Sequence, residues 1–301
     1  MQVLLTGGSG DLGTVLTPRL LAHGDTPLRL DIVPPRDPHG QYLDGSILDR
    51  DALAQAMDRV EAVVHIAAWH GIHESTGQKD ATAFWDLNVT GTFNVFEAAA
   101  RAGVTKLVYL SSTSIRKRSS LYGHTKVLGE EIARTYAARH GMRVIILRPR
   151  GFIPHWNRAA YASFVEWAQW FWHGAVHIDD VAQAVLQSLD RMQTPVPSPV
   201  PPLVLDSAYD YSDADLQHWD ADGVGTTFAR TYPHYVELAL RYGFKPEEPP
   251  IKLDSSEARR WLDYTPRYRL GNLLDELARY GPAGPPPPDG YRLDGLPGRE
   301  R

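Results

Sequence analysis

One stretch of sixteen residues, SSTSIRKRSSLYGHTK at 111–126, holds the residue types that proton and hydride transfer require. Ser112 and Thr113 supply hydroxyls that could bond a reacting oxygen, and Tyr122 is a phenol suited to general acid–base catalysis. Lys126 follows Tyr122 by four residues, so on a helix the two side chains share a face. The same residues also fit a strand end, a basic loop and an ordinary helix, so the rest of the chain must decide.

Strand-like and helix-like patterns alternate over the first 150 residues. Short apolar runs predict strands over 2–6, 27–33, 61–68, 106–112 and 142–149, and helical spacing predicts helices over 12–24, 49–57, 81–103 and 121–141. This alternation predicts an α/β fold, a Rossmann-type doubly wound parallel sheet with helices on both faces. In such a sheet the ligand crevice lies at the carboxyl ends of the strands, where the hydroxyl cluster follows residue 110.

The chain becomes less regular after Pro149. We expect residues 1–150 to form a dinucleotide-binding domain to which residues 175–206 return, and residues 151–174 with 207–280 to form a small, mostly helical substrate-binding region. Helices are predicted over 177–190, over 226–243 with an interruption at Pro233, and over 253–264. The proline-rich connector 193–202 should be extended, and the Pro- and Gly-rich tail 281–301 should be mobile.

A glycine-rich segment, TGGSGDLG at 6–13, connects the first predicted strand to the first helix. Gly7, Gly10 and Gly13 allow a tight turn, close approach to a pyrophosphate and close helix packing, so that N–H groups at the helix start face the phosphates. Asp31 ends the second strand 18 residues after Gly13, where an acid accepts hydrogen bonds from ribose hydroxyls. Because its charge would repel a 2′-phosphate, NAD is favoured over NADP, with Arg36 as the residue that would favour NADP instead.

Taken together, these motifs resemble the extended short-chain dehydrogenase/reductase superfamily, typified by NAD-dependent sugar epimerases and dehydratases. The resemblance covers residues 1–190 well and 250–280 loosely. Its matching segments are TGGSGDLG, Asp31, GSI at 45–47, HIAA at 65–68, Asn88 in DLNVTGTFNVFEAA, the SST cluster, YGHTK, LRP at 147–149, HIDDVAQAV and LDSSEARRWLDYTP.

The resemblance implies a role for each matching position. Tyr122 would be the general acid/base, Lys126 would hold the nicotinamide ribose, and Thr113 would bond the reacting oxygen, with Ser112 as the second choice. The phenol pKa, about 10 when free, would be lowered by the Lys126 ammonium and by an oxidised nicotinamide. The residues expected at the NAD site are Gly7, Gly10, Asp11, Leu12, Gly13, Asp31, Ser46, Ile47, Ala67, Ala68, Asn88, Ser111, Tyr122, Lys126 and Pro149.

The chain departs from the family pattern between Thr113 and Tyr122, where the linker is unusually short. Arg116, Lys117 and Arg118 stand there, and they fit either a solvated basic turn or a site for an anionic substrate. Ser114-Ile115 replaces the Asp-Glu pair that sugar-nucleotide dehydratases carry, so dehydratase activity is not expected.

A second departure follows Pro149, where Arg150-Gly151 replaces an asparagine common in nucleotide-sugar enzymes. Only 25 residues then separate Gly151 from His177, which favours a compact subtype such as the uronate dehydrogenases. The aromatic residues of this segment fit either the wall of a small pocket or core and dimer packing; they are Trp156, Tyr161, Phe164, Trp167, Phe171 and Trp172.

The leading interpretation is an NAD-dependent oxidoreductase acting on a secondary alcohol of a small sugar-like or sugar-acid substrate. The alternatives are a sugar or nucleotide-sugar epimerase with tightly held NAD, and a non-catalytic redox sensor that binds the dinucleotide. The resemblance also implies a homodimer formed by helix 88–101 and the Tyr122 helix, with Phe93, Val95, Phe96 and Val127–Leu128 as its apolar surface.

Composition excludes several other classes. The net charge of −5 gives no footprint for nucleic acid or an anionic membrane, and the chain has no cysteine. Neither a membrane-spanning apolar run nor a signal peptide is visible, so the cytoplasm is expected. The loop histidines His70 and His73, with His173 and His177 elsewhere, are not expected to bind a metal, because hydride transfer needs none.

Overall fold

The computed structural model describes residues 1–117, 119–195, 200–219 and 226–289. Arg118 of the basic turn, residues 196–199 of the connector and residues 290–301 of the tail lie outside this part. In the described part, residues 281–289 of the predicted tail contact the domain, because the Pro285 carbonyl oxygen lies 3.0 Å from Nε2 of His155. No helix of the described residues is long and apolar enough to cross a membrane.

Seven parallel strands of the described residues form one sheet in the order β3-β2-β1-β4-β5-β6-β7, which confirms the predicted α/β fold. The central strands consist of apolar residues because helices cover both of their faces. The strand order reverses between β1 and β4, which is the point where doubly wound sheets open a ligand crevice. The strands are β1 (Gln2–Thr6), β2 (Thr26–Asp31), β3 (Gln41–Asp44), β4 (Ala62–His65), β5 (Lys106–Leu110), β6 (Arg143–Pro149) and β7 (Leu203–Leu205).

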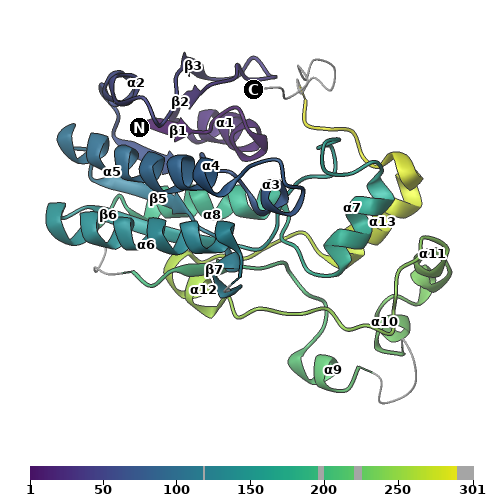
Figure 1. Cartoon of the computed structure of the whole chain (residues 1–301). Helices are drawn as coiled ribbons and strands as arrows, with labels where there is room; N and C mark the ends of the chain where they lie inside the picture. The colour runs from purple at the N-terminus through teal and green to yellow at the C-terminus, as the bar shows by residue number, and fades with distance from the viewer. Residues whose placement is uncertain (118, 196–199, 220–225, 290–301) are drawn as a thin grey trace.

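Two helical layers cover the sheet, with α5 and α6 in front of the strands and α8 behind them in Figure 1. One layer is α2 (Arg50–Ala56), α5 (Thr92–Arg101) and α6 (Leu121–His140), and the other is α1 (Asp11–His23), α8 (Ile178–Arg191) and α12 (Ser256–Leu262). Each layer buries its own apolar cluster against the sheet. The predicted helix boundaries in this half agree with the structure to within a few residues.

The long helix predicted over 81–103 is present but is not regular. It comprises α4 (Ala81–Trp85), a π-helical turn η1 (Asp86–Gly91) and α5. A π-helical turn accommodates an extra residue and often occurs at functional sites. This turn contains the buried Asn88.

Several elements of the described residues were not predicted from the sequence patterns. Strands β3 and β7 have four and three residues, too few for a periodic signal, and α13 (Leu270–Tyr280) follows an irregular polar stretch. The remaining helices are α3 (Gly71–Ser75), α7 (Phe164–Trp172), α9 (Asp213–Gln217), α10 (Thr226–Thr231) and α11 (Val236–Arg241), with 3-10 turns η2 (Thr113–Arg116), η3 (Pro233–Tyr235) and η4 (Gly281–Ala283).

The aromatic segment after β6 packs mainly as core. Phe164, Trp167, Phe171 and Trp172 of α7 are all buried, with Trp167 only 1% exposed. They belong to a third apolar cluster together with leucines of α13 and aromatics of residues 211–244. Trp156 instead joins the cluster beneath α1 and α8. These side chains could have formed the wall of a small pocket or packed in the core, and in the structure they pack in the core.

The surface of α5 differs in part from the expected dimer face. Val95 and Phe96 are completely buried against the sheet, so they cannot contact a second subunit as expected. Phe93 on the same helix is 40% exposed and Trp85 of α4 is 50% exposed. Of the apolar residues expected on this face of α5, Phe93 is therefore exposed, whereas Val95 and Phe96 belong to the core.

Candidate active site

The glycine loop between β1 and α1 is too tightly packed for side chains. Gly7 has φ of +68°, and a Cβ there would lie 2.8 Å from the Ala67 backbone. A Cβ on Gly13 would lie 2.1 Å from the carbonyl oxygen of Gly8, so any side chain would push α1 away from the turn. Helix α1 starts at Asp11 with Gly10 as its N-cap and no side-chain cap, as phosphate-binding helices require.

Asp31 lies at the carboxyl end of β2, next to this loop. Its Oδ2 accepts a hydrogen bond from the backbone N–H of Ser9 at 3.0 Å, and its Oδ1 accepts one from Val33 at 3.3 Å. The carboxylate is thus oriented beside the glycine turn, where a ribose would follow a pyrophosphate. The other predicted NAD residues near this end are more enclosed: Leu12 and Ile47 are core residues, Asp11 accepts from Asn157, and Ser46 accepts from the N–H of Leu48.

The three hydroxyl residues after β5 have different partners. Ser111 donates to Oε1 of Glu130 at 2.6 Å and is buried, so its hydroxyl is held inside the structure. Thr113 points its Oγ1 at the Pro149 carbonyl oxygen, 3.4 Å away. Ser112 accepts a hydrogen bond from the N–H of Ser114 at 3.0 Å, and it lies near enough to Tyr122 for its side chain to lower the pKa of the phenol. Both Ser112 and Thr113 therefore stay candidates for binding a reacting oxygen.

Tyr122 and Lys126 both point inward from α6. Tyr122 is 8% exposed, Lys126 is 3% exposed, and the Lys126 Nζ lies 5.9 Å from the centre of the Tyr122 ring. The ammonium donates a hydrogen bond to the carbonyl oxygen of Leu110, the last residue of β5, at 2.7 Å. The helix therefore presents both groups to the carboxyl end of the sheet.

The protonation of this pair is governed by burial. Burial raises the pKa of the Tyr122 phenol to about 12, against a lowering by the hydrogen bond with Ser112. Burial also lowers the pKa of the Lys126 ammonium to about 7, against a raising by the charge of Glu130. Lys126 alone therefore does not bring the phenol pKa toward neutrality, and further positive charge is needed to form a phenolate.

Asn88 connects the crevice loop after β4 to α6. Its Oδ1 accepts from the N–H of Trp69 at 2.7 Å, and its Nδ2 donates to the Trp69 carbonyl and the Thr125 hydroxyl at 3.0 Å each. Ala67 of the same loop packs against Gly7. A chain of contacts thus joins the glycine loop to the Tyr122 helix. Asn88 was predicted to line the cofactor site, and its side-chain amide forms these hydrogen bonds with Trp69 and Thr125.

Glu130 was missed in the sequence although it follows Lys126 by four residues on α6. It accepts two hydrogen bonds from Arg148, at 2.7 and 2.6 Å, and one from Ser111. Burial alone would raise the pKa of this carboxyl, but the bonds from Arg148 and Ser111 keep it below the usual range. Glu130 thereby ties α6 to the ends of β5 and β6. The i,i+4 spacing from Lys126 was the available signal.

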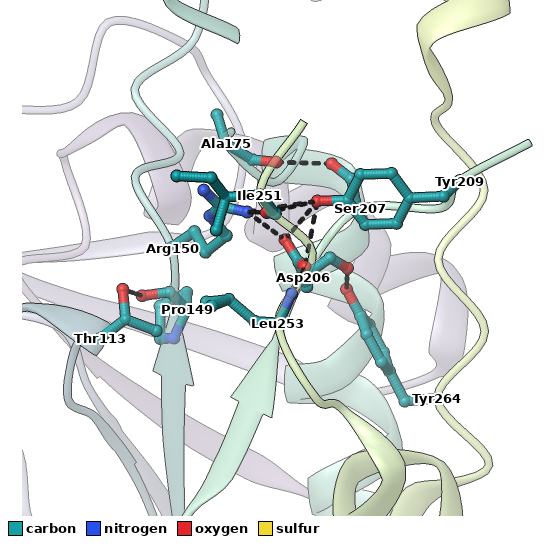
Figure 2. A network of polar contacts seen from close by, with 10 residues as sticks. All are labelled: Thr113, Pro149, Arg150, Ala175, Asp206, Ser207, Tyr209, Ile251, Leu253 and Tyr264. Carbon is teal, nitrogen blue, oxygen red and sulfur yellow. Dashed lines mark hydrogen bonds and ion pairs between the residues drawn. The ribbon is translucent and has the colours of Figure 1, made fainter. Parts of the chain in front are cut away.

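A polar network lies beyond β6 and β7 (Figure 2). Asp206 accepts from Arg150 at 3.1 Å, from the Tyr209 hydroxyl and from the N–H of Leu253 at 2.6 Å. Arg150 also donates to the carbonyl oxygen of Ile251. The guanidinium that replaces the family asparagine is thus bound to protein groups, and it joins the sheet to the C-terminal region.

Among the described residues, no group of three or more His, Cys, Asp or Glu side chains could hold a metal ion. His73 accepts a hydrogen bond from the N–H of His70 at 2.9 Å, and the His70 ring lies 6.2 Å from the Tyr122 ring. His177 begins α8 and stacks on Tyr268 at 4.1 Å.

Known proteins share this architecture. The sequence model described as "NAD dependent epimerase/dehydratase family" matches residues 3–153. Uronate dehydrogenase of Pseudomonas putida is 28% identical over 169 residues, covering 49% of this chain and 59% of that protein. A 3 beta-hydroxysteroid dehydrogenase/Delta 5-->4-isomerase of Mycobacterium tuberculosis is 30% identical over 190 residues, covering 55% of this chain and 50% of that protein. The chain spans about half the length of these curated relatives.

The fold is also similar to a solved structure. The crystal structure of UDP-glucuronic acid 4-epimerase from Bacillus cereus, in complex with UDP-glucuronic acid and NAD, superposes with a TM-score of 0.66. The two sequences are 19% identical, and the match covers 91% of this chain and 97% of that one. At this identity the likeness shows the fold alone.

Proposed function

Because the chain belongs to the NAD dependent epimerase/dehydratase family, whose cofactor is NAD, we propose that it is an NAD-dependent oxidoreductase. Its substrate is the secondary alcohol of a small sugar-like or sugar-acid molecule. The observation that carries this proposal is that Tyr122 and Lys126 are both buried at the carboxyl end of β5, with the Lys126 Nζ 5.9 Å from the centre of the Tyr122 ring, and with Ser112 nearby. A phenol, a hydroxyl and an ammonium in that arrangement suit proton removal from an alcohol.

The chain's own residues handle the proton. The substrate hydroxyl would bond to Ser112 and to the Tyr122 phenolate, which takes its proton as the carbon–oxygen double bond forms. Held by the glycine loop and Asp31, NAD+ would supply the hydride acceptor for the same carbon and a positive charge near the phenol. Lys126 is buried beside Tyr122, so little water screens the interaction between its positive charge and the phenolate. The products are a carbonyl compound, NADH and one proton.

The NAD site in this proposal is the glycine loop with Asp31. The close backbone packing at Gly7 and Gly13 fixes the turn before α1, so that the N-terminus of α1 would face a pyrophosphate, and the Asp31 carboxylate would bind the adenosine ribose. Ala67, Ala68 and Pro149 line the path toward Tyr122. Asn88 and Ser111 support this site from behind through their hydrogen bonds.

A small substrate is supported by the C-terminal half. The side chains of α7 that could wall a wide nucleotide site are packed against α13, and Arg150 is bound to Asp206. We propose that residues 151–174 and 207–280 form the substrate-binding region and that residues 1–150 with 175–206 bind NAD. The similarity to a uronate dehydrogenase favours a sugar acid. We retain a homodimer and a cytoplasmic location as parts of this proposal.

The proposal is tested by incubating the protein with NAD and a panel of sugars, sugar acids and polyols, and recording NADH absorbance. Tyr122→Phe should lower kcat by about 10²-fold or more with little change in NAD affinity, because it removes the proton acceptor and little volume. Lys126→Met should reduce both kcat and the affinity for NAD. Tyr136→Phe, at a tyrosine of the same helix whose hydroxyl donates to Glu97 at 2.7 Å, is the matched control and should retain activity.

Three outcomes distinguish the alternatives. NADH formation that Tyr122→Phe does not reduce would contradict the proposed chemistry. Substrate interconversion without net NADH, with NAD copurifying, would identify an epimerase instead. NAD binding without turnover of any panel member, together with unchanged binding in Tyr122→Phe, would favour a redox sensor.

A further inference from the structure

A carboxylate from the crevice loop lies at the start of the Tyr122 helix. Glu74, in the short helix α3, accepts hydrogen bonds from the N–H of Leu121 at 2.6 Å, the N–H of Tyr122 at 3.1 Å and the Ser120 hydroxyl at 2.9 Å. Glu74 and these donors are more than 45 residues apart in sequence. None of the sequence motifs indicated this contact.

The position suits a negative charge. The first N–H groups of a helix have no intrahelical acceptor and lie at the positive end of its dipole. Ser120 caps one of them by accepting from Gly123, and Glu74 takes the N–H groups of Leu121 and Tyr122. Burial acts to raise the pKa of Glu74, but the bonds from Leu121, Tyr122 and Ser120 hold it below the usual range. The carboxylate is therefore charged at neutral pH.

The segment that Glu74 anchors also covers the phenol. A Cβ built on Gly71 would lie 3.4 Å from the Tyr122 ring, and the His70 ring lies beside it. At its other end the segment is held by Asn88, which bonds both backbone groups of Trp69. Residues 69–74 are thus fixed at both ends, and the middle of the segment lies against Tyr122.

We propose that Glu74 is a positioning residue for the reaction at Tyr122, holding segment 69–74 against the N-terminus of α6 so that the phenol stays buried and aimed at Ser112. The inference rests on the proposed function and extends it to a residue outside the Tyr-Lys-Ser set. The Glu74 carboxylate holds the backbone of Tyr122 by accepting from the Tyr122 N–H. It also anchors the segment that covers the Tyr122 ring. Its loss should therefore affect the chemical step more than dinucleotide binding.

The test compares Glu74→Gln and Glu74→Ala with Glu131→Gln, an exposed glutamate on the same helix paired with Arg134. We expect kcat to fall at least tenfold in Glu74→Ala. In Glu74→Gln the fall in kcat should be smaller, because an amide oxygen still accepts hydrogen bonds. NAD affinity should stay within about threefold of wild type. The pH dependence of kcat should shift to lower pH, because a better solvated Tyr122 loses the burial that raises its pKa. Glu131→Gln should change none of these.

Hydrogen exchange followed by mass spectrometry provides a readout that needs no substrate. Peptides covering residues 69–75 and 120–123 should exchange faster in Glu74→Gln than in wild type, while Glu131→Gln leaves them unchanged. If the wild type forms no NADH with any panel member, the proposed function fails and the exchange result still decides the positioning role. Unchanged exchange, or a folded Glu74→Gln and Glu74→Ala with wild-type kcat and pH profile, would overturn the inference.

Discussion

Ser112 lies near enough to Tyr122 for its side chain to lower the pKa of the phenol, while the adjacent Thr113 directs its hydroxyl toward the Pro149 carbonyl oxygen, 3.4 Å away. Ser112 is the N-cap of the 3-10 turn η2 and Thr113 is its first residue, so the two hydroxyls have different neighbours. The family resemblance placed the reacting-oxygen contact first at Thr113. We predict that Ser112, the second choice, makes this contact.

Ser112→Ala should therefore lower kcat by about 10-fold or more, because a donor to the developing charge is lost in a site of low polarity. Thr113→Ala removes a hydroxyl from the same turn and serves as the comparison, with an effect of less than about threefold expected. Steady-state kinetics of NADH formation on the substrate that the panel identifies measure both. The opposite ranking would restore Thr113 as the contact.

Asp31 should set the cofactor preference. We expect NAD to bind at least tenfold more tightly than NADP, because a carboxylate facing a 2′-phosphate costs more than about 1.4 kcal/mol. Asp31→Asn should reduce the ratio of the NAD affinity to the NADP affinity. Asp44→Asn is the matched control, since Asp44 ends β3 directly beside Asp31 in the sheet. Calorimetric titration gives both affinities, and equal or tighter NADP binding by the wild type would transfer the role to Arg36.

The exposed apolar side chains of α4 and α5 predict self-association. We expect the wild type to sediment at micromolar concentration as a dimer of 33.6 kDa chains. Phe93→Glu should shift the equilibrium to monomer, because a charge buried in an apolar interface lacks a partner. Leu240→Glu, at a residue 59% exposed on α11, should leave the dimer intact. A wild-type monomer would exclude this assembly.

His65 should stay neutral well below its usual range. Burial, with the nearby Lys126 charge, lowers its pKa to about 3, whereas the hydrogen bond to Asp25 raises the pKa of His23 above 6.5. In a pH titration followed by NMR, the ring signals of His65 should not move between pH 8 and 5, while those of His23 should titrate. A His65 ring that titrates near pH 6.5 would contradict the buried position between Thr6 and Thr92.

The same histidine links stability to pH. Below pH 6.5 the unfolded chain binds a proton at His65 that the folded chain does not, so the free energy of unfolding falls as pH drops toward 3. The loss from this one group reaches about 1.4 kcal/mol per pH unit. Denaturant unfolding at pH 7, 6 and 5 measures the free energy of unfolding, which should decline less with falling pH for His65→Asn than for wild type. Equal declines would contradict the role given to His65.

Local spacing was sufficient for much of this protein. The glycine turn, Asp31 and the Tyr122–Lys126 pair each depend on a few consecutive residues or on one helical turn, and the strand–helix alternation predicts the doubly wound sheet. The family resemblance rests on the same local motifs, and the family match over residues 3–153 confirms it. Burial of whole helices against a sheet follows from such patterns because one apolar face must be covered.

Contacts between distant segments needed the tertiary structure. Glu74 meets the N-terminus of α6 across more than 45 residues, and Glu130 meets Arg148 across 18. Periodicity does not report which carboxylate reaches which helix end, because such pairs depend on how separate elements pack.

By itself, then, the sequence determined the sheet, the dinucleotide turn and the residue types available for proton transfer. Only the tertiary structure decided that Ser112 lies near the phenol, that Val95 and Phe96 lie in the core, and that the aromatic residues of α7 pack against α13. Short-range order is encoded in backbone propensity and apolar spacing, which act within one element. The direction of a loop side chain and the partner of an apolar face are set by atoms far away along the chain, and these meet only when the elements are packed.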